Sequence, residues 1–170
     1  MIAEIRLKLD DDSRQRLDAF VEQLAARTKN IDGALKNTGE ALLQTTRDRF
    51  ETGTDPQGRK WKPLSALTVR LRGASSPVLW NTGRLRGSIS WSISGGRLEL
   101  GPNTVDAAVH QFGATIVPRE KKALRIPAGR GGAVFAGKVK IPARPYIGFG
   151  PKDEQAAMDA LEDWLDVLQS

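Results

Sequence analysis

The chain has 170 residues, of which 39% are hydrophobic and 27% charged, and it contains no cysteine. Disulfides and cysteine-based zinc or redox sites are therefore excluded. The length favours one domain spanning residues 1–170. No apolar run approaches the roughly 18 residues of a membrane-spanning helix, and the first residues lack a signal-peptide pattern. We therefore expect a protein made in the cytosol that has no membrane partner.

Charge is unevenly distributed along the chain, although the net value is only +6. Residues 56–98 contain eight Lys or Arg and no acid, and residues 107–152 contain nine against a single acid, Glu120. Residues 153–170 reverse this pattern, with six acids and no basic residue. Such asymmetry suits a polyanionic partner such as nucleic acid. It equally suits copies of one chain that pack positive face against negative face.

The first third of the chain is predicted to hold one strand and two helices. Apolar and charged residues alternate over residues 2–9, as in a half-buried strand. A helix capped by Asp11-Asp12-Ser13 is expected to reach about Thr28, because apolar residues recur at helical spacing, namely Leu17, Phe20, Val21 and Leu24. A second helix is predicted from about Asp32 to Glu51 and ends at Gly53; its apolar stripe is Ile31, Leu35, Leu42, Thr46 and Phe50.

The middle of the chain is predicted to contain turns, a short helix and a hairpin. Residues 55–58, Asp-Pro-Gln-Gly, have the composition of a tight turn. A short helix capped by Ser65 is expected within residues 63–71, and residues 81–88 form a second corner punctuated by glycine. Strand patterns at 89–93 and 97–100 flank Ser94-Gly95-Gly96 and predict a β-hairpin.

The last third is predicted to contain a short helix at 105–112, stopped by Gly113, and three strands at 115–117, 124–126 and 134–141. A basic, glycine-rich tract at 128–132 interrupts the strands, so we expect a mobile hairpin arm over about residues 119–140. Residues 141–149 cannot form a regular helix, because Pro142 and Pro145 lack the N–H donor. They are expected to form a rigid corner before a closing helix, whose inner face carries Ala157, Leu161, Trp164, Leu165 and Leu168.

Together these elements predict an α+β fold. It has two N-terminal helices, a mainly antiparallel β-sheet with a long hairpin arm, and a C-terminal helix packed on the sheet. The six acids after Lys152 are expected on a solvated or partner-facing side of that helix.

No residue pattern indicates catalysis, a metal site or a cofactor. The single histidine, His110, has no second histidine or cysteine with which to build a metal site or a triad. A packing or hydrogen-bonding role is expected for it, and a pH-sensitive contact with a partner is the alternative. Residues 132–138 match part of a phosphate-binding loop, but Val139 stands where Ser or Thr would hold Mg²⁺. No convergent pair of carboxylates is evident, so we expect no enzyme and no cofactor.

A nucleic-acid partner is the main alternative to a structural role. Lys and Arg are interleaved with Trp61, Trp80 and Trp91, and such a surface can follow phosphates and stack on bases. The tryptophans stand beside Pro, Leu and Ile, however, where anchoring of a core is the commoner use. No helix-turn-helix or zinc-finger pattern is present. The alternative is therefore a non-specific DNA-binding accessory protein.

Four separated motifs resemble those of one protein family. Residues 55–65 follow Arg49-Phe50, precede Thr68 and read DPQGRKWKPLS, which resembles the signature PxGxxWxPLS. Residues 79–89 read LWNTGRLRGSI, which is similar to LxxTGxLxxSI. Residues 110–113 and 141–148 read HQFG and IPARPYIG, close to the motifs HQxG and IPARPFLG. The family is that of phage virion morphogenesis or tail completion proteins, and the motifs cover about residues 49–149.

The resemblance implies a structural subunit without catalytic residues, located at the head–tail junction of the virion and in the host cytoplasm during assembly. Related neck, tail-terminator and completion proteins form rings, commonly of six copies. The implied partners are further copies of the chain, the tail tube protein, connector or stopper proteins on the head side, and DNA that passes through the ring without sequence recognition. Residues 1–30 and 119–140 lie outside the motifs.

Two groups of residues are expected to carry this role. The first should stiffen the corners, with Trp61, Leu85 and Tyr146 acting from inside; it comprises Trp61, Pro63, Gly83, Leu85, Gln111, Gly113, Pro142, Arg144, Pro145 and Tyr146. The second should face a neighbouring copy, the tail tube or DNA from the arm, although solubilising loop charges are the alternative. It comprises Arg119, Lys121, Lys122, Arg125, Arg130, Lys138 and Lys140.

Overall fold

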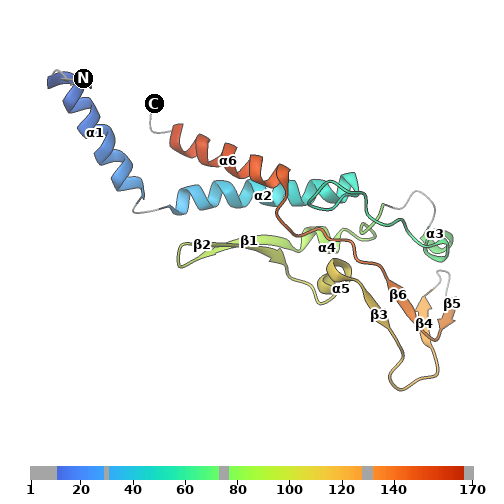
Figure 1. The fold of residues 1–170 in the computed structure, drawn as a ribbon. Coiled ribbons are helices and arrows are strands. Elements are labelled where there is room, and N and C mark those ends of the chain that lie inside the picture. Colours follow the sequence, from blue (N-terminus) through green and yellow to red (C-terminus); the bar gives the residue numbers. More distant parts are fainter. Residues whose placement is uncertain (1–10, 29–30, 73–76, 128–131, 167–170) are drawn as a thin grey trace, which may run out of the picture.

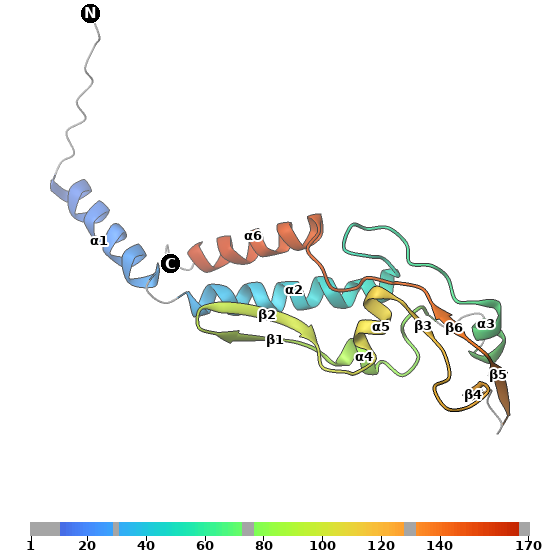
Figure 2. The same ribbon diagram turned by 60° about the horizontal axis from the view of Figure 1, so that its bottom comes forward.

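The computed structural model describes residues 11–28, 31–72, 77–127 and 132–166. It begins with helix α1 (Asp11–Thr28), which confirms the first predicted helix. The strand predicted over residues 2–9 lies outside the described residues. Helix α1 projects away from the rest of the chain in Figures 1 and 2. Its described side chains are exposed, apart from the half-buried Ser13.

Helix α2 (Asp32–Thr52) is the central element of the body. It ends as predicted at Gly53, which adopts φ 65° and donates its N–H to the carbonyl of Arg49 at 2.8 Å. The predicted stripe is right for Thr46 and Phe50, which are buried, and wrong for Ile31, which is 41% exposed. The buried surface of α2 is wider than one stripe because other elements cover two of its sides; it also includes Ala34, Gly39, Leu43 and Arg49.

Turns and two short helices follow α2. The predicted tight turn at 55–58 is confirmed by a hydrogen bond from the N–H of Gly58 to the carbonyl of Asp55 at 2.9 Å. Helix α3 (Ala66–Arg72) begins directly after Ser65, whose Oγ accepts the N–H of Thr68 at 3.2 Å, as expected for a cap. Helix α4 (Arg84–Gly87) is a single turn within the second predicted corner.

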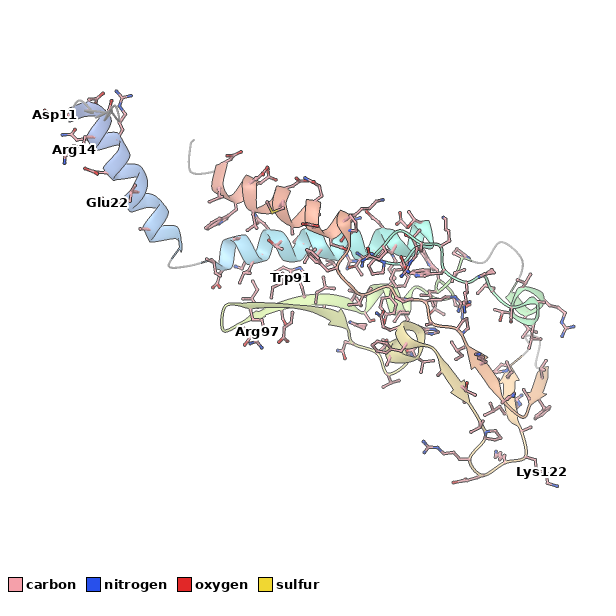
Figure 3. All side chains as sticks on the ribbon, in the orientation of Figure 1. Asp11, Arg14, Glu22, Trp91, Arg97 and Lys122 are labelled. Carbon is pink, nitrogen blue, oxygen red and sulfur yellow. The ribbon has the colours of Figure 1, made fainter. Side chains whose placement is uncertain are left out.

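The predicted hairpin is confirmed as strands β1 (Ile89–Ser94) and β2 (Arg97–Pro102). They pair antiparallel, with Ser94 opposite Arg97 and Ile89 opposite Pro102. Figure 3 shows Trp91 between the hairpin and α2. A Cβ on Gly39 would lie 2.7 Å from the Trp91 ring, so the missing side chain at position 39 allows the hairpin to approach the helix.

Helix α5 (Ala107–Phe112) and four short strands form the next part of the chain. The strands are β3 (Ala114–Ile116), β4 (Leu124–Pro127), β5 (Ala133–Ala136) and β6 (Val139–Ile141). β3 pairs with β6 and β4 pairs with β5, both antiparallel, so the described residues of 114–141, hereafter the arm, form two ribbons in series. The continuous strand predicted over 134–141 is wrong, because the chain bends at Gly137 and Lys138. Among the described residues, three separate two-stranded sheets replace the predicted single meandering sheet.

Helix α6 (Pro151–Asp166) packs along α2, on the side opposite the β1–β2 hairpin (Figure 1). The C-terminal helix was predicted to pack on the sheet, but it packs on α2 instead, because α2 lies between α6 and the hairpin. Ala157 and Trp164 are half-buried as predicted, but Leu161 and Leu165 are 38% and 40% exposed. The fully buried residues of the inner face are instead Asp153 and Ala160. Leu168 lies outside the described residues.

The arrangement confirms an α+β fold with three layers, α6, α2 and β1–β2, and with α1 and the arm extending in different directions (Figure 2). The buried core lies where α2, α4, α5 and the chain between the arm and α6 meet; it comprises Leu43, Phe50, Trp61, Leu85, Ile89, Ala107 and Tyr146. No helix in the described ranges is long and apolar enough to cross a membrane.

Candidate functional site

Residues 144–150, hereafter the hub segment, link the arm to α6 in an extended path. Within the described part of the chain, no strand pairs with this segment. Backbone N–H and C=O groups that leave water need partners nonetheless. The molecule supplies them from side chains that come from widely separated positions in the sequence.

Four side chains donate hydrogen bonds to consecutive parts of the hub segment. The indole Nε1 of Trp61 donates to the carbonyl of Pro145 at 2.8 Å, and Nη1 of Arg49 donates to that of Tyr146 at 2.8 Å. The side-chain amide of Gln111 donates to the carbonyl of Ile147 at 2.7 Å, and that of Gln57 donates to the carbonyl of Phe149 at 3.2 Å. These four side chains satisfy backbone carbonyl groups that a neighbouring strand would satisfy in a sheet.

Gln111 is the donor that also accepts. Its Oε1 takes the N–H of Tyr146 at 3.0 Å and the N–H of Ile147 at 3.1 Å, while its Nε2 bonds the Ile147 carbonyl. Gly113 lies two residues on, with φ 75°, and a Cβ there would lie 2.7 Å from the Ala143 nitrogen. The predicted HQFG motif therefore places an amide against the hub segment and lets the backbone pass close beside it.

An aromatic cluster fixes the side-chain face of the hub segment. The ring centroid of Phe50 lies 5.6 Å from that of Trp61 and 5.4 Å from that of Tyr146. The Tyr146 hydroxyl donates to the carbonyl of Ala107 at 3.2 Å, which joins α5 to the cluster. Burial, with a smaller effect from the Asp106 carboxylate, raises the pKa of Tyr146 to about 12. The phenol is therefore held neutral.

Arg144, at the start of the hub segment, is a buried cation whose hydrogen bonds go to carbonyl groups. Nε donates to the carbonyl of Lys62 and Nη2 to that of Pro63, both at 2.8 Å. Its backbone N–H donates to the carbonyl of His110 at 2.9 Å. Burial lowers the pKa of the Arg144 guanidinium below its ordinary value. Arg144 thus ties together the chain before α3, the end of α5 and the hub segment.

A buried ion pair fixes the other end of the hub segment. Arg49 of α2 and Asp153 of α6 form a salt bridge in which both side chains are buried. Thr45 donates its hydroxyl to Asp153 Oδ1 at 2.6 Å, and the N–H of Gly150 donates to Oδ2 at 2.8 Å. Asp153, the third helical residue, therefore caps the start of α6 by accepting the N–H of the residue before the helix, with Pro151 in the first helical position. The expectation that Asp153 is one of the solvated or partner-facing acids is wrong.

The tight turn at 55–58 packs directly against the last residue of the hub segment. A Cβ on Gly150 would lie 1.8 Å from the carbonyl oxygen of Pro56, so only glycine permits this approach. The turn is stabilised from within by Asp55, which accepts the backbone N–H groups of Gln57 and Arg59 at 2.9 Å. Burial alone would raise the pKa of the Asp55 carboxyl, but these bonds and the Arg59 guanidinium together lower the pKa below its ordinary value.

The second corner, around α4, contacts the same core from another side. Gly83 adopts φ 74° before α4, and Leu85 is buried in the cluster that also holds Trp61 and Tyr146. Arg86 lies 4.8 Å above the ring of Trp80 and pairs with Glu51 of α2 at 2.8 Å. Helix α4 is thereby attached to α2.

The structure brings most of the predicted corner residues to one place. Trp61, Pro63, Gln111, Arg144, Pro145 and Tyr146 meet at the hub segment through the bonds above. Gly113 lies against Ala143, and Pro142 lines a neighbouring cleft with Gly83 and Leu85. Sequence reasoning missed the roles of Arg49, Asp153 and Gln57. A charged residue beside Phe50 on a buried helix face, and an acid three residues after Gly150, were the available signals.

The predicted arm residues that the structure describes are exposed on the arm. Lys122 lies near its far end in Figure 3. Arg119, Lys121, Lys122, Arg125, Lys138 and Lys140 are all exposed, and among the described residues none of these six has a salt-bridge partner. Arg130 lies outside the described residues. The arm is therefore a basic projection, and its mobility stays a prediction.

A cleft of about 800 Å³ lies between α3, the corner at 79–85 and the inner faces of β4, β5 and β6. Its walls are apolar, and they include Leu64, Leu67, Leu71, Leu79, Ile126 and Val139. Basic residues also line it, namely Lys62, Arg84, Lys138, Lys140 and Arg144, together with the acid Asp106. An apolar cleft edged with positive charge suits an amphipathic partner that carries acids.

The sequence features tested for chemistry are placed as follows. The imidazole Nε2 of His110 lies 4.0 Å from the Asp106 carboxylate, one helical turn away. Residues 133–136 of the phosphate-loop match form strand β5, not a loop that opens a helix. In the ranges that the structure describes, no group of three or more His, Asp or Glu is placed to hold a metal ion.

Comparisons with known proteins agree with the motif pattern. The model of the phage virion morphogenesis family matches residues 12–166. The chain is 26% identical over 162 residues to "Mu-like prophage FluMu G protein 2" of Haemophilus influenzae, covering 95% of this chain and 98% of that protein. It is 28% identical over 155 residues to "Putative capsid assembly protein G" of Escherichia phage Mu, covering 86% of each. No solved structure matches the chain.

Proposed function

Because the chain belongs to the phage virion morphogenesis family, we propose that it is a structural assembly protein that completes the tail at the head–tail junction. The observation that carries the proposal is the family match over residues 12–166, which includes the body, the hub segment, the arm and α6. The names of the two relatives point in the same direction, since one is that of a prophage protein and the other that of a capsid assembly protein.

The construction of the hub segment supports a role as a rigid building block. Its hydrogen bonds use residues of three of the four motifs, and they connect α2, the 55–65 segment, α5 and α6. Side chains bound in this way define the geometry of a scaffold, and they leave the projecting elements to make contacts. Helix α1 and the arm project from the body in Figure 1 and can reach neighbouring subunits.

In this proposal the chain forms a closed ring, with six copies as the expected number. A heterologous interface closes into a ring when its rotation divides the circle. The basic arm and the acidic outer side of α6 provide two complementary surfaces for it. The tail tube protein and the head-side connector or stopper proteins are the proposed neighbours of the ring, and DNA passes through the ring without sequence recognition.

A DNA-binding accessory role is the second candidate function, because the basic arm is exposed. The tryptophans give this candidate little support, because Trp61 is buried, Trp80 stacks with Arg86 and Trp91 packs on Gly39 of α2. Phosphate contacts from the arm alone would produce binding that weakens steeply as salt rises. A junction protein should instead associate with tails whether or not DNA is present.

The proposal is tested with a prophage or phage in which this gene is inactivated. Electron microscopy of the induced lysate should show filled heads and tails that are not joined, and adding the purified protein should restore joined particles. Joined, infectious particles in the absence of the protein would contradict the proposal. Purified protein that binds DNA tightly at low salt but has no effect on joining would favour the accessory role.

A further inference from the structure

Helix α6 presents an apolar stripe to solvent. Met158 is 52% exposed, Leu161 38% and Leu165 40%. The spacing of i, i+3 and i+7 places these three side chains on one side of the helix, away from the buried Asp153 and Ala160. The stripe is therefore an ordered face that α2 does not cover.

Acids flank this stripe. Glu162 and Asp166 are both exposed. Because they continue from Met158 at steps of four residues, they form a row beside the apolar residues. Asp159 and Asp163 extend the negative surface further round the helix. An amphipathic helix of this kind, with anchors at i, i+3 and i+7 and acids at the side, is suited to a basic-edged apolar groove.

The cleft between α3 and the arm is such a groove. Leu67 and Leu71 of α3 line it together with Ile126 of β4 and Val139 of β6, and its volume of about 800 Å³ can admit several side chains. Lys138 and Lys140 also line it. Both lysines are exposed, so they are available to acids on an incoming helix.

The cleft and the stripe of one chain cannot meet. In Figures 1 and 2, α3 and the β4–β5 ribbon lie at one end of the molecule, whereas α6 runs along α2 towards the other end. A contact between these two different surfaces joins one copy to the next in a head-to-tail manner.

We propose that the Met158–Leu161–Leu165 stripe of one copy docks into the α3–arm cleft of the next copy, with Glu162 and Asp166 beside Lys138 and Lys140. This inference rests on the proposed self-association and specifies its interface. The apolar side chains supply the burial, and the charges set the register and disfavour contact between two stripes or two clefts.

The absence of cysteine from the chain allows a direct test by cross-linking. Two full-length single variants, Leu161→Cys on the stripe and Ala136→Cys in the cleft, are purified, mixed and oxidised. A covalent dimer should form in the mixture and should be nearly absent when either variant is oxidised alone, because the interface joins unlike surfaces. A mixture of Leu161→Cys with Ser92→Cys, on the exposed face of β1, is the matched control. A test mixture that yields no more dimer than this control overturns the proposal.

Charge reversal provides an independent test of register. The variant Lys138→Glu/Lys140→Glu should need roughly tenfold more protein for half-maximal assembly, as expected for the loss of two exposed charge pairs. Adding Glu162→Lys/Asp166→Lys to the same chain should restore assembly. Arg97→Glu on the hairpin is the control for a change of charge elsewhere, and it should leave assembly unchanged. Failure of the combined variant to recover would count against the pairing, and sedimentation velocity supplies the measurement.

The same variants separate this interface from the proposed function. They are introduced into the phage and scored for joining of heads to tails. The docking model alone is overturned if the cysteine pair does not cross-link and charge reversal does not change assembly, while the phage still requires the protein for joining. Normal cross-linking by a protein that joining does not require would instead contradict the proposed function and leave the interface standing.

Discussion

At the scale of residues, the main feature is that side chains replace a strand partner for the hub segment. Trp61, Gln111 and Arg49 each satisfy a backbone carbonyl there. Such bonds are weak when exposed, but the cost of leaving a buried carbonyl without a partner makes each one important. The loss of one donor should therefore destabilise the whole hub segment.

Arg49→Met should destabilise the protein strongly. The change leaves the buried Asp153 carboxylate without its cation and the Tyr146 carbonyl without its donor. Breaking a buried pair by removing one partner costs about 3–5 kcal/mol. Urea denaturation followed by tryptophan fluorescence measures the loss of unfolding free energy. The double variant Arg49→Met/Asp153→Leu should lose less than the sum of the two single changes, and simple additivity would show that the pair is not coupled.

Tyr146 should make stability fall at alkaline pH. Its pKa in the folded protein is about 12, above the ordinary value of 10.0. The folded state therefore holds this proton more tightly than the unfolded state, and the resulting stability is complete below pH 10 and is lost as pH rises from about 10 to 12. Tyr146 is the only tyrosine, so tyrosinate absorbance reports it alone. Tyr146→Phe should lack this contribution, and ionisation near pH 10 in the folded protein would contradict the account.

At the scale of elements, α2 is the support on which the other layers are assembled. It contacts α6 on one side and β1–β2 on the other. Two glycines on α2 make these contacts close, since a Cβ on Gly33 would lie 2.7 Å from Trp164 and one on Gly39 would lie 2.7 Å from Trp91. Glycine is unfavourable inside a helix, so here helix propensity is sacrificed for packing.

Gly39→Ala should lower the melting temperature, although alanine is the better helix former. The gain in helix propensity is about 0.5–1 kcal/mol, whereas forcing a methyl group against the Trp91 ring costs about 1–3 kcal/mol. Asn37→Ala is the control, because Asn37 is exposed on the same helix and its replacement creates no crowding. Differential scanning calorimetry should show opposite shifts for the two variants. A higher melting temperature for Gly39→Ala would show that the hairpin does not pack closely on α2.

At the scale of the whole molecule, a stable body carries two projections. The body holds the buried residues, whereas the described side chains of α1 are exposed apart from the half-buried Ser13. Helix α1 lies apart from the body in Figure 1. Because it shares few contacts with the core, it should contribute little to the unfolding free energy of the body.

Ala19→Pro should break α1 without destabilising the body. Proline inside a helix costs about 3 kcal/mol or more, but this cost is confined to a helix that the core does not need. All four tryptophans, at 61, 80, 91 and 164, lie outside α1, so their fluorescence reports the body alone. The midpoint of thermal unfolding should stay unchanged. Ala41→Pro in α2 is the control and should abolish cooperative unfolding, and an equal effect of the two changes would show that α1 is part of the core.

Local patterns in the sequence were sufficient for most elements and for the family. Helical spacing, Ser65 as a cap, Gly53 as a stop and the Ser94-Gly95-Gly96 turn each depend on near neighbours in the chain. The bounds of α1, α2, α3 and the β1–β2 hairpin therefore lie close to the predicted ones. The four motifs likewise indicated the family without knowledge of how they meet.

The partners of each element required the fold. Arg49 and Asp153 are 104 residues apart in sequence, and nothing near either residue reveals that one buried charge will meet the other. Helix α6 packs against α2 by its Asp153–Ala160 side, so the spacing of apolar residues was right for Ala157 and Trp164 but wrong for Leu161 and Leu165, which are exposed. Periodicity determines which residues share a face, but the face that is buried is set by long-range contacts, and these exist only once the chain has folded.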